Sequence, residues 1–135
     1  MRTALRAILI VGGIAAVLIA LGHIMLGPAF IPGAVPVNAT MDSEDRFYAA
    51  IFLGFGVTLI WCAGSVERRA QVIRFLVSLF FLGGCARLIS IVFVGPPNLF
   101  FQVMTALELL LPPAIWLLPA TVECRTRTAG QPQPP

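Results

Sequence analysis

Arg87 is the residue around which any chemistry of this chain must be arranged, because it lies within an apolar run at residues 72–94. A guanidinium group in the middle of a membrane-spanning helix costs roughly 2.5–3.5 kcal/mol to insert. It needs a counter-ion, and Glu108 is the one acid expected at a matching depth. From the helical rise, Arg87 lies roughly 10 Å and Glu108 roughly 13 Å below the same ends of their helices. We expect an ion pair between these side chains.

Three further polar residues are expected at the same end of the helices. His23 lies near the end of one apolar segment, and Glu44 and Arg46 lie at the start of the next. With Arg87 and Glu108 they form a candidate ligand-binding or structural polar cluster. His23, Glu44 and Glu108 make only a thin candidate for a metal site, because a metal needs several ligands. We therefore expect no metal, and no residue is assigned a catalytic role.

Several functions are compatible with this cluster. The pair Arg87–Glu108 fixes helix register in a structural interpretation, although buried ion pairs often fail to offset their desolvation. In the favoured interpretation the cluster binds a lipid, isoprenoid or quinone-like ligand, with no cofactor. One alternative is an accessory or assembly subunit of a larger membrane complex, or a homo-oligomer. Another is a membrane lipid-modifying enzyme in which Glu108 donates and accepts protons.

The composition indicates that these residues lie in a lipid bilayer rather than in water. Of 135 residues, 59% are hydrophobic and 11% are charged, with a mean hydropathy of +0.94. A soluble domain is about 25% charged, so this chain has too little polar surface to cover a water-soluble globule. The nine basic residues are all Arg and form no basic stripe, which argues against nucleic-acid binding.

Hydropathy and helix breakers divide the chain into four spans and a tail. Apolar stretches predict helices at about residues 4–26, 43–64, 71–94 and 99–119, and a disordered cytoplasmic tail at residues 121–135. Arg residues gather at one side of the predicted spans, which places both termini in the cytoplasm. The fold class is an all-α, up-down bundle of four transmembrane helices, in a multi-pass protein of the bacterial cytoplasmic membrane.

Small residues indicate which helix faces pack together. Those predicted to lie at close helix contacts are Gly12, Ala16 and Ala20, then Ala50, Gly54, Thr58 and Cys62. Gly83 and Gly84 lie one turn before Arg87. A second set of apolar side chains, Phe75, Leu79, Val92 and Phe100, is the face expected to be covered if another chain binds.

The chain resembles a known family in three short motifs. They are the sequence SEDRFY at residues 43–48, GCAR at residues 84–87 and LEL at residues 107–109. The resemblance covers about residues 10–120 and is to small bacterial four-helix membrane proteins described as a domain of unknown function, loosely similar to DoxX-like proteins. It implies a four-helix membrane bundle and no established activity.

Overall fold

The computed structural model describes the backbone of residues 2–129 and the side chains of residues 3–115. These residues form four α-helices and one short 3-10 helix, and no strand is found among them. The elements are α1 (Arg2–Leu26), η1 (Gly27–Phe30), α2 (Ala39–Ala63), α3 (Ala70–Val94) and α4 (Leu99–Ala129). The structure confirms the predicted bundle of four helices.

The described helices have the length and composition of membrane spans. Three candidate spans cover Thr3–Phe30, Ala39–Ala63 and Ala70–Val94, and a shorter apolar stretch covers Leu99–Ile115. About 20 apolar residues are needed to cross the hydrocarbon core. The protein is therefore a membrane protein.

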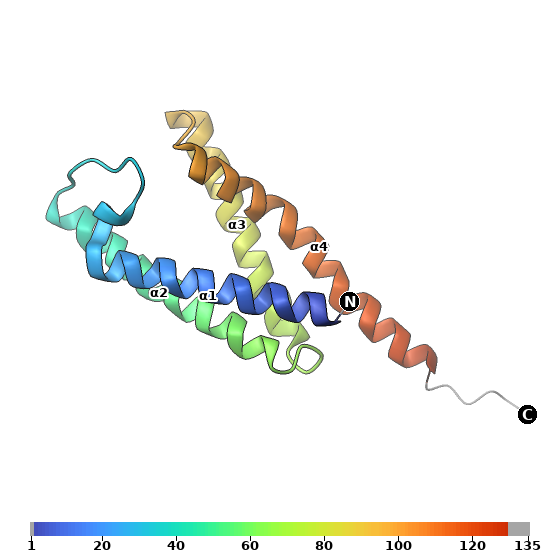
Figure 1. The fold of residues 1–135 in the computed structure, drawn as a ribbon. Coiled ribbons are helices and arrows are strands. Elements are labelled where there is room, and N and C mark those ends of the chain that lie inside the picture. Colours follow the sequence, from blue (N-terminus) through green and yellow to red (C-terminus); the bar gives the residue numbers. More distant parts are fainter. Residues whose placement is uncertain (1, 130–135) are drawn as a thin grey trace, which may run out of the picture.

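The helices form two hairpins that meet at one end and diverge at the other (Figure 1). α1 packs along α2 and α3 packs along α4, whereas α2 and α3 touch over a short stretch. The core joins all four helices near the start of α1 and the α2–α3 turn. Its buried members are Leu5, Leu9, Leu59, Cys62, Ala63, Ile73, Leu76, Val77 and Ile115. The opposite halves of the hairpins are left apart.

α2 begins at Ala39, four residues before the predicted start at residue 43. The cap is Asn38, whose side chain accepts a hydrogen bond of 2.9 Å from the Met41 backbone N–H. An Asn side chain satisfies one of the free N–H groups of a first turn. The acids at residues 42–45 therefore lie within the helix rather than in front of it.

α4 continues to Ala129, beyond the predicted end at residue 119. Residues 121–129 contain neither Pro nor Gly, so nothing in them breaks the helix that precedes them. The expected disordered tail at residues 121–135 is thus helical as far as Ala129. Residues 130–135 of that tail lie outside the described residues.

The close contact of α1 and α2 is made by glycines one and two positions away from those predicted. A Cβ on Gly13 would lie 2.8 Å from the carbonyl oxygen of Gly56, so no larger residue fits there. Cβ atoms on Gly12 and Gly54 would meet no atom of the described chain within 4 Å. The predicted Ala16, Ala20 and Cys62 are buried, as expected. Gly12, Ala50 and Gly54 are exposed, because a strict four-residue step drifts around a helix of 3.6 residues per turn.

Candidate functional site

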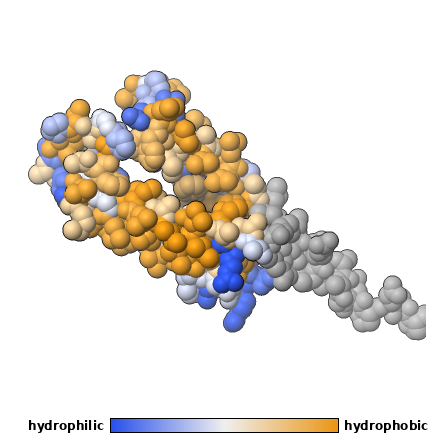
Figure 2. Space-filling model, in the orientation of Figure 1, coloured by the Kyte–Doolittle hydropathy of each residue, from blue (hydrophilic) through white to orange (hydrophobic). Residues whose placement is uncertain are grey.

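A cleft of about 1010 Å³ separates the diverging halves of the two hairpins. Figure 2 shows it as a hollow in a surface that is otherwise mostly apolar. Its walls are largely apolar and include aromatic side chains from three helices: Phe52 and Phe55 from α2, Phe80 from α3, and Phe100 and Phe101 from α4. Clefts of this composition favour apolar ligand groups over water.

Stacked rings connect the hairpins at one side of this cleft. The ring centroids of Phe52 and Phe55 are 5.7 Å apart, and those of Phe55 and Phe80 are 6.0 Å apart. Phe55 thereby bridges α2 and α3, which touch over a short stretch. The aromatic wall is continuous across the junction between the hairpins.

The wall formed by α3 and α4 carries the predicted pair of Arg87 and Glu108. Arg87 Nε donates a hydrogen bond of 3.1 Å to Glu108 Oε1 and lies 2.8 Å from Oε2. The Glu108 residue is 6% exposed, whereas the Arg87 side chain is 42% exposed. The buried salt bridge expected from the sequence is confirmed, and its basic member is the one open to the cleft.

Close packing of α3 on α4 positions the acid of this pair. A Cβ on Gly84 would lie 2.9 Å from the Glu108 Cβ, so the bare backbone of Gly84 makes room for the acid. One turn before Glu108, the buried Thr105 hydroxyl donates to the Phe101 carbonyl oxygen at 2.8 Å. Glu108 is consequently held against α3, at the back of the cleft.

The Arg87 guanidinium has unused hydrogen-bonding capacity. Its carbon lies 5.4 Å from the centre of the Phe101 ring, a distance typical of a cation–π contact. Within the described residues, neither terminal amino group donates a hydrogen bond to the protein. Donors of this kind in apolar surroundings require acceptors from elsewhere.

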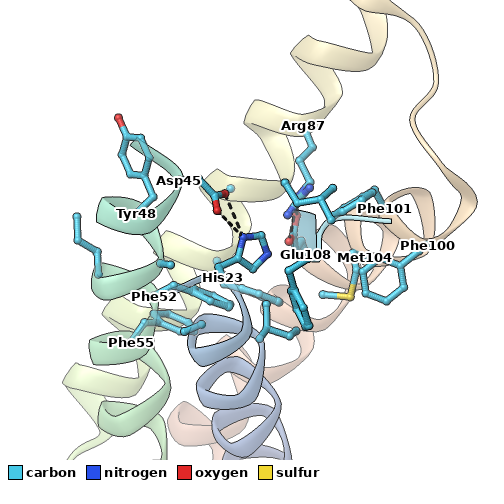
Figure 3. A pocket seen from close by; sticks show the side chains of 18 of the residues that line it. His23, Asp45, Tyr48, Phe52, Phe55, Arg87, Phe100, Phe101, Met104 and Glu108 are labelled. Carbon is cyan, nitrogen blue, oxygen red and sulfur yellow. Dashed lines mark hydrogen bonds and ion pairs between the residues drawn. The ribbon is translucent and has the colours of Figure 1, made fainter. Parts of the chain in front are cut away.

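The opposite wall carries a second pair, His23 of α1 with Asp45 of α2 (Figure 3). His23 Nδ1 lies 3.0 Å from both carboxylate oxygens of Asp45, and the two side chains are 20% and 19% exposed. A carboxylate only accepts, so Nδ1 carries the hydrogen and Nε2 of the neutral ring is an acceptor. The ring of Phe30 packs edge-on to the His23 ring, with 5.3 Å between the ring centroids.

Asp45 is the cleft residue that sequence reasoning missed. It was one of three acids at the start of a helix, where an acid normally complements the helix dipole. The signal that identifies it is spacing: Asp45, Ala49 and Phe52 follow one another at helical intervals and all line the cleft. Only the position of the helix start decides which acid shares this face.

Glu44 and Arg46, the remaining members of the predicted cluster, lie outside the cleft. Glu44 is exposed. Arg46 donates to Asp42 from Nε at 2.9 Å and from Nη2 at 3.2 Å, and its Nη1 donates to the carbonyl oxygen of Ile24. Successive residues of a helix point about 100° apart, so the neighbours of Asp45 face elsewhere. Arg46 therefore ties α2 to the end of α1.

Three of the five predicted members thus line the cleft, and together with Asp45 they form a cleft set of four side chains. The cleft set is His23, Asp45, Arg87 and Glu108. Among the described residues, no group of three or more His, Cys, Asp or Glu side chains is placed to hold a metal. The arrangement offers two hydrogen-bonding centres on facing walls of an apolar space.

Comparison with known proteins identifies the family. The model of the domain of unknown function DUF4345 matches residues 4–118, so the chain belongs to this family. No curated protein and no solved structure matches the chain.

Proposed function

We propose that the chain, as a member of a family without an assigned function, binds an amphipathic, lipid-like molecule in the cleft. The apolar part of this ligand, a lipid, isoprenoid or quinone-like chain, lies against the aromatic walls. Its polar group lies between the two ion pairs. The observation that carries this proposal is the placement of ionisable side chains on both walls of one apolar cleft.

The physical argument starts from the cost of polar groups in a membrane. Charged side chains in spans are rare, and they mark sites of substrates, ions or ligands more often than they stabilise a fold. The guanidinium of Arg87 lies against the open cleft rather than inside the packed hairpin. A ligand with a polar group would give its terminal amino groups the acceptors that the described protein does not supply.

We further propose that the protein lies in a bacterial cytoplasmic membrane with both termini in the cytoplasm. Arg68, Arg69 and Arg74 lie near the α2–α3 turn, and Arg6 lies near the N-terminus. Basic residues of this kind favour the cytoplasmic side. In this orientation the cleft opens in the outer half of the bilayer, because the hairpins meet at the cytoplasmic end.

Filling the cleft with a side chain tests the proposal. Gly83 lines the cleft, and a Cβ there would meet no described atom within 4 Å, so Gly83→Leu is expected to fold and occupy the space. Gly54→Leu is the matched control, because Gly54 has the same free space and does not line the cleft. Native mass spectrometry of protein extracted gently from membranes measures any lipid that co-purifies.

We expect a bound lipid in the wild type and in Gly54→Leu, and at least a tenfold lower occupancy in Gly83→Leu. Equal occupancy in all three proteins would overturn the cleft as the binding site. Recovery of a stoichiometric second protein without lipid would instead favour an accessory subunit of a larger complex. Phe75 and Val92 of α3 are exposed as that alternative requires, whereas Leu79 and Phe100 line the cleft.

A further inference from the structure

We infer that the cleft selects a lipid with an uncharged, hydroxyl-bearing head group, and that this hydroxyl donates to His23 Nε2 while its oxygen accepts from Arg87. The inference rests on the proposed function and narrows its ligand class. It follows from two properties of the four side chains of the cleft set: the sum of their charges and the hydrogen-bonding positions that they leave open.

The charges of the cleft set exclude an anionic head group. Arg87 is offset by Glu108, and Asp45 is offset only as far as His23 is protonated. The sum is therefore −1 with a neutral imidazole and 0 with a charged one, and it is never positive. A phosphate or carboxylate entering this apolar space would meet two carboxylates, and each cation there is already paired with one of them.

A nearby cation does not alter this balance. Arg46 follows Asp45 in α2, but it is bound to Asp42 and to the Ile24 carbonyl oxygen. It is also absent from the cleft lining. Recruiting it would break two hydrogen bonds to Asp42 within α2 and the one to Ile24 that joins α2 to α1. The anion would gain one contact at the expense of that connection.

The open hydrogen-bonding positions favour a hydroxyl over a cationic head group. The terminal amino groups of Arg87 are donors, and a cationic amine has no lone pair to offer them. In the neutral ring, His23 Nε2 is an acceptor, and it receives no hydrogen bond from the part of the chain that the structure describes. A hydroxyl group satisfies both positions, because it has one hydrogen to donate and an oxygen that accepts.

The shape of the site agrees with this assignment. His23 and Asp45 lie on one wall of the cleft, and Arg87 and Glu108 lie on the wall that faces them (Figure 3). The rest of the lining is mostly apolar and offers no competing charged group. One small polar group between the walls can therefore anchor a long apolar chain that follows the aromatic side chains outward.

Four probes that share one tail test the head group. They are farnesol, its methyl ether, farnesyl phosphate and farnesylamine, each used to displace tritiated farnesol from the full-length protein in detergent micelles. We expect farnesol to bind at least tenfold more tightly than the phosphate and the amine. Hydrogen bonds to charged groups contribute about 1.5–3 kcal/mol, which corresponds to about 10- to 100-fold in Kd.

The methyl ether isolates the contact with His23, because it keeps the acceptor oxygen and lacks the hydrogen. Farnesol should bind about 3- to 10-fold more tightly than the ether in the wild type. The double variant His23→Phe/Asp45→Leu should reduce this ratio to about 1 to 2, since it removes the acceptor and leaves neither member of the pair unpaired. Both probes are uncharged, so the altered charge of the cleft affects them equally.

The outcomes separate this inference from the proposed function. Tighter binding of the phosphate or the amine that is lost in Gly83→Leu would overturn the uncharged head group and leave the cleft as a lipid site. An unchanged farnesol-to-ether ratio in the double variant would overturn the role of His23. Binding of none of the four probes, or binding that Gly83→Leu leaves intact, would contradict both proposals.

Discussion

The two ion pairs of the cleft differ in how their charges are shielded. Glu108 is almost entirely buried between α3 and α4, and Arg87 is its single basic contact among the described residues. His23 and Asp45 are both partly exposed, so each has some access to the cleft. A carboxylate buried in apolar surroundings is tolerated only with a partner. Glu108 therefore depends on Arg87 more strongly than Asp45 depends on His23.

Removal of Arg87 should expose this dependence. We expect Arg87→Leu to lower the free energy of unfolding by about 3–5 kcal/mol, because Glu108 would stay buried without its counter-ion. The double variant Arg87→Leu/Glu108→Leu should recover most of that loss. Reversible unfolding in mixed detergent micelles measures both values, with Arg68→Leu as a control at an exposed position outside the cleft. A double variant as unstable as the single one would show that packing, rather than a stranded charge, was lost.

One pair was predictable from the sequence and the other was not, for a physical reason. Arg87 needed a counter-ion within the membrane, and Glu108 was the one acid at a suitable depth. His23 had several acids within reach, at residues 42–45, and a shift of one residue turns a side chain by about 100°. The Asn38 cap determines where α2 begins and therefore which way its acids point. The sequence offers several other plausible helix starts nearby, so this one could not be singled out.

At the scale of the helices, two adjacent glycines of α3 have opposite environments. A Cβ on Gly84 would lie 2.9 Å from the Glu108 Cβ and 3.0 Å from Leu109 Cδ2. A Cβ on Gly83 would enter the open cleft and meet no described atom within 4 Å. Gly84 thus sets the separation of α3 and α4, and Gly83 leaves the cleft its width.

Alanine at these two positions should act in opposite directions. We expect Gly84→Ala to lower the free energy of unfolding by about 1–3 kcal/mol, because the added methyl group forces α4 and its Glu108 away from α3. Gly83→Ala should raise it by about 0.5–1 kcal/mol through helix propensity. Unfolding in mixed micelles again provides the comparison. Equal effects of the two substitutions would contradict the helix contact at Gly84.

The sequence identifies both glycines but not their roles. Small residues indicated close helix contacts, which Gly84 makes, whereas Gly83 leaves open space in the cleft. The same limit applies to α1 and α2, where the predicted Gly12 and Gly54 face outward and Gly13 contacts Gly56. Small residues indicate that two helices can approach each other closely. Which residues make the contact depends on the rotation of each helix, and that rotation is set by packing along its whole length.

At the scale of the whole molecule, the cleft exists because the two hairpins pack unevenly. Each hairpin has extensive contacts of its own, while α2 and α3 touch over a short stretch. Large buried side chains such as Ile73 hold the hairpins together at the end that carries the core. Hydropathy predicted four helices, three of which are candidate membrane spans by length and composition, but it carries no information on whether neighbouring hairpins close along their full length. The divergence of the hairpins was therefore not predictable from the chain.

The orientation of the molecule in the membrane decides which half of the bilayer feeds the cleft, and single cysteines test it. In a variant with Cys62, Cys85 and Cys124 replaced by alanine, we expect Val35→Cys to react with a membrane-impermeant maleimide in intact cells. Val35 is 73% exposed in the connection between α1 and α2, near the open end of the hairpins. The matched position is Arg68→Cys in the α2–α3 turn, also exposed.

Arg68→Cys should react only after the membrane is permeabilised, because basic residues are retained on the cytoplasmic side. With this result the cleft takes its ligand from the outer leaflet. The reverse pattern, with Arg68→Cys labelled in intact cells and Val35→Cys protected, would invert the molecule and direct the search for the ligand to the inner leaflet. The geometry of the cleft would be the same in both cases, since it depends on contacts within the chain rather than on the side from which the lipid enters.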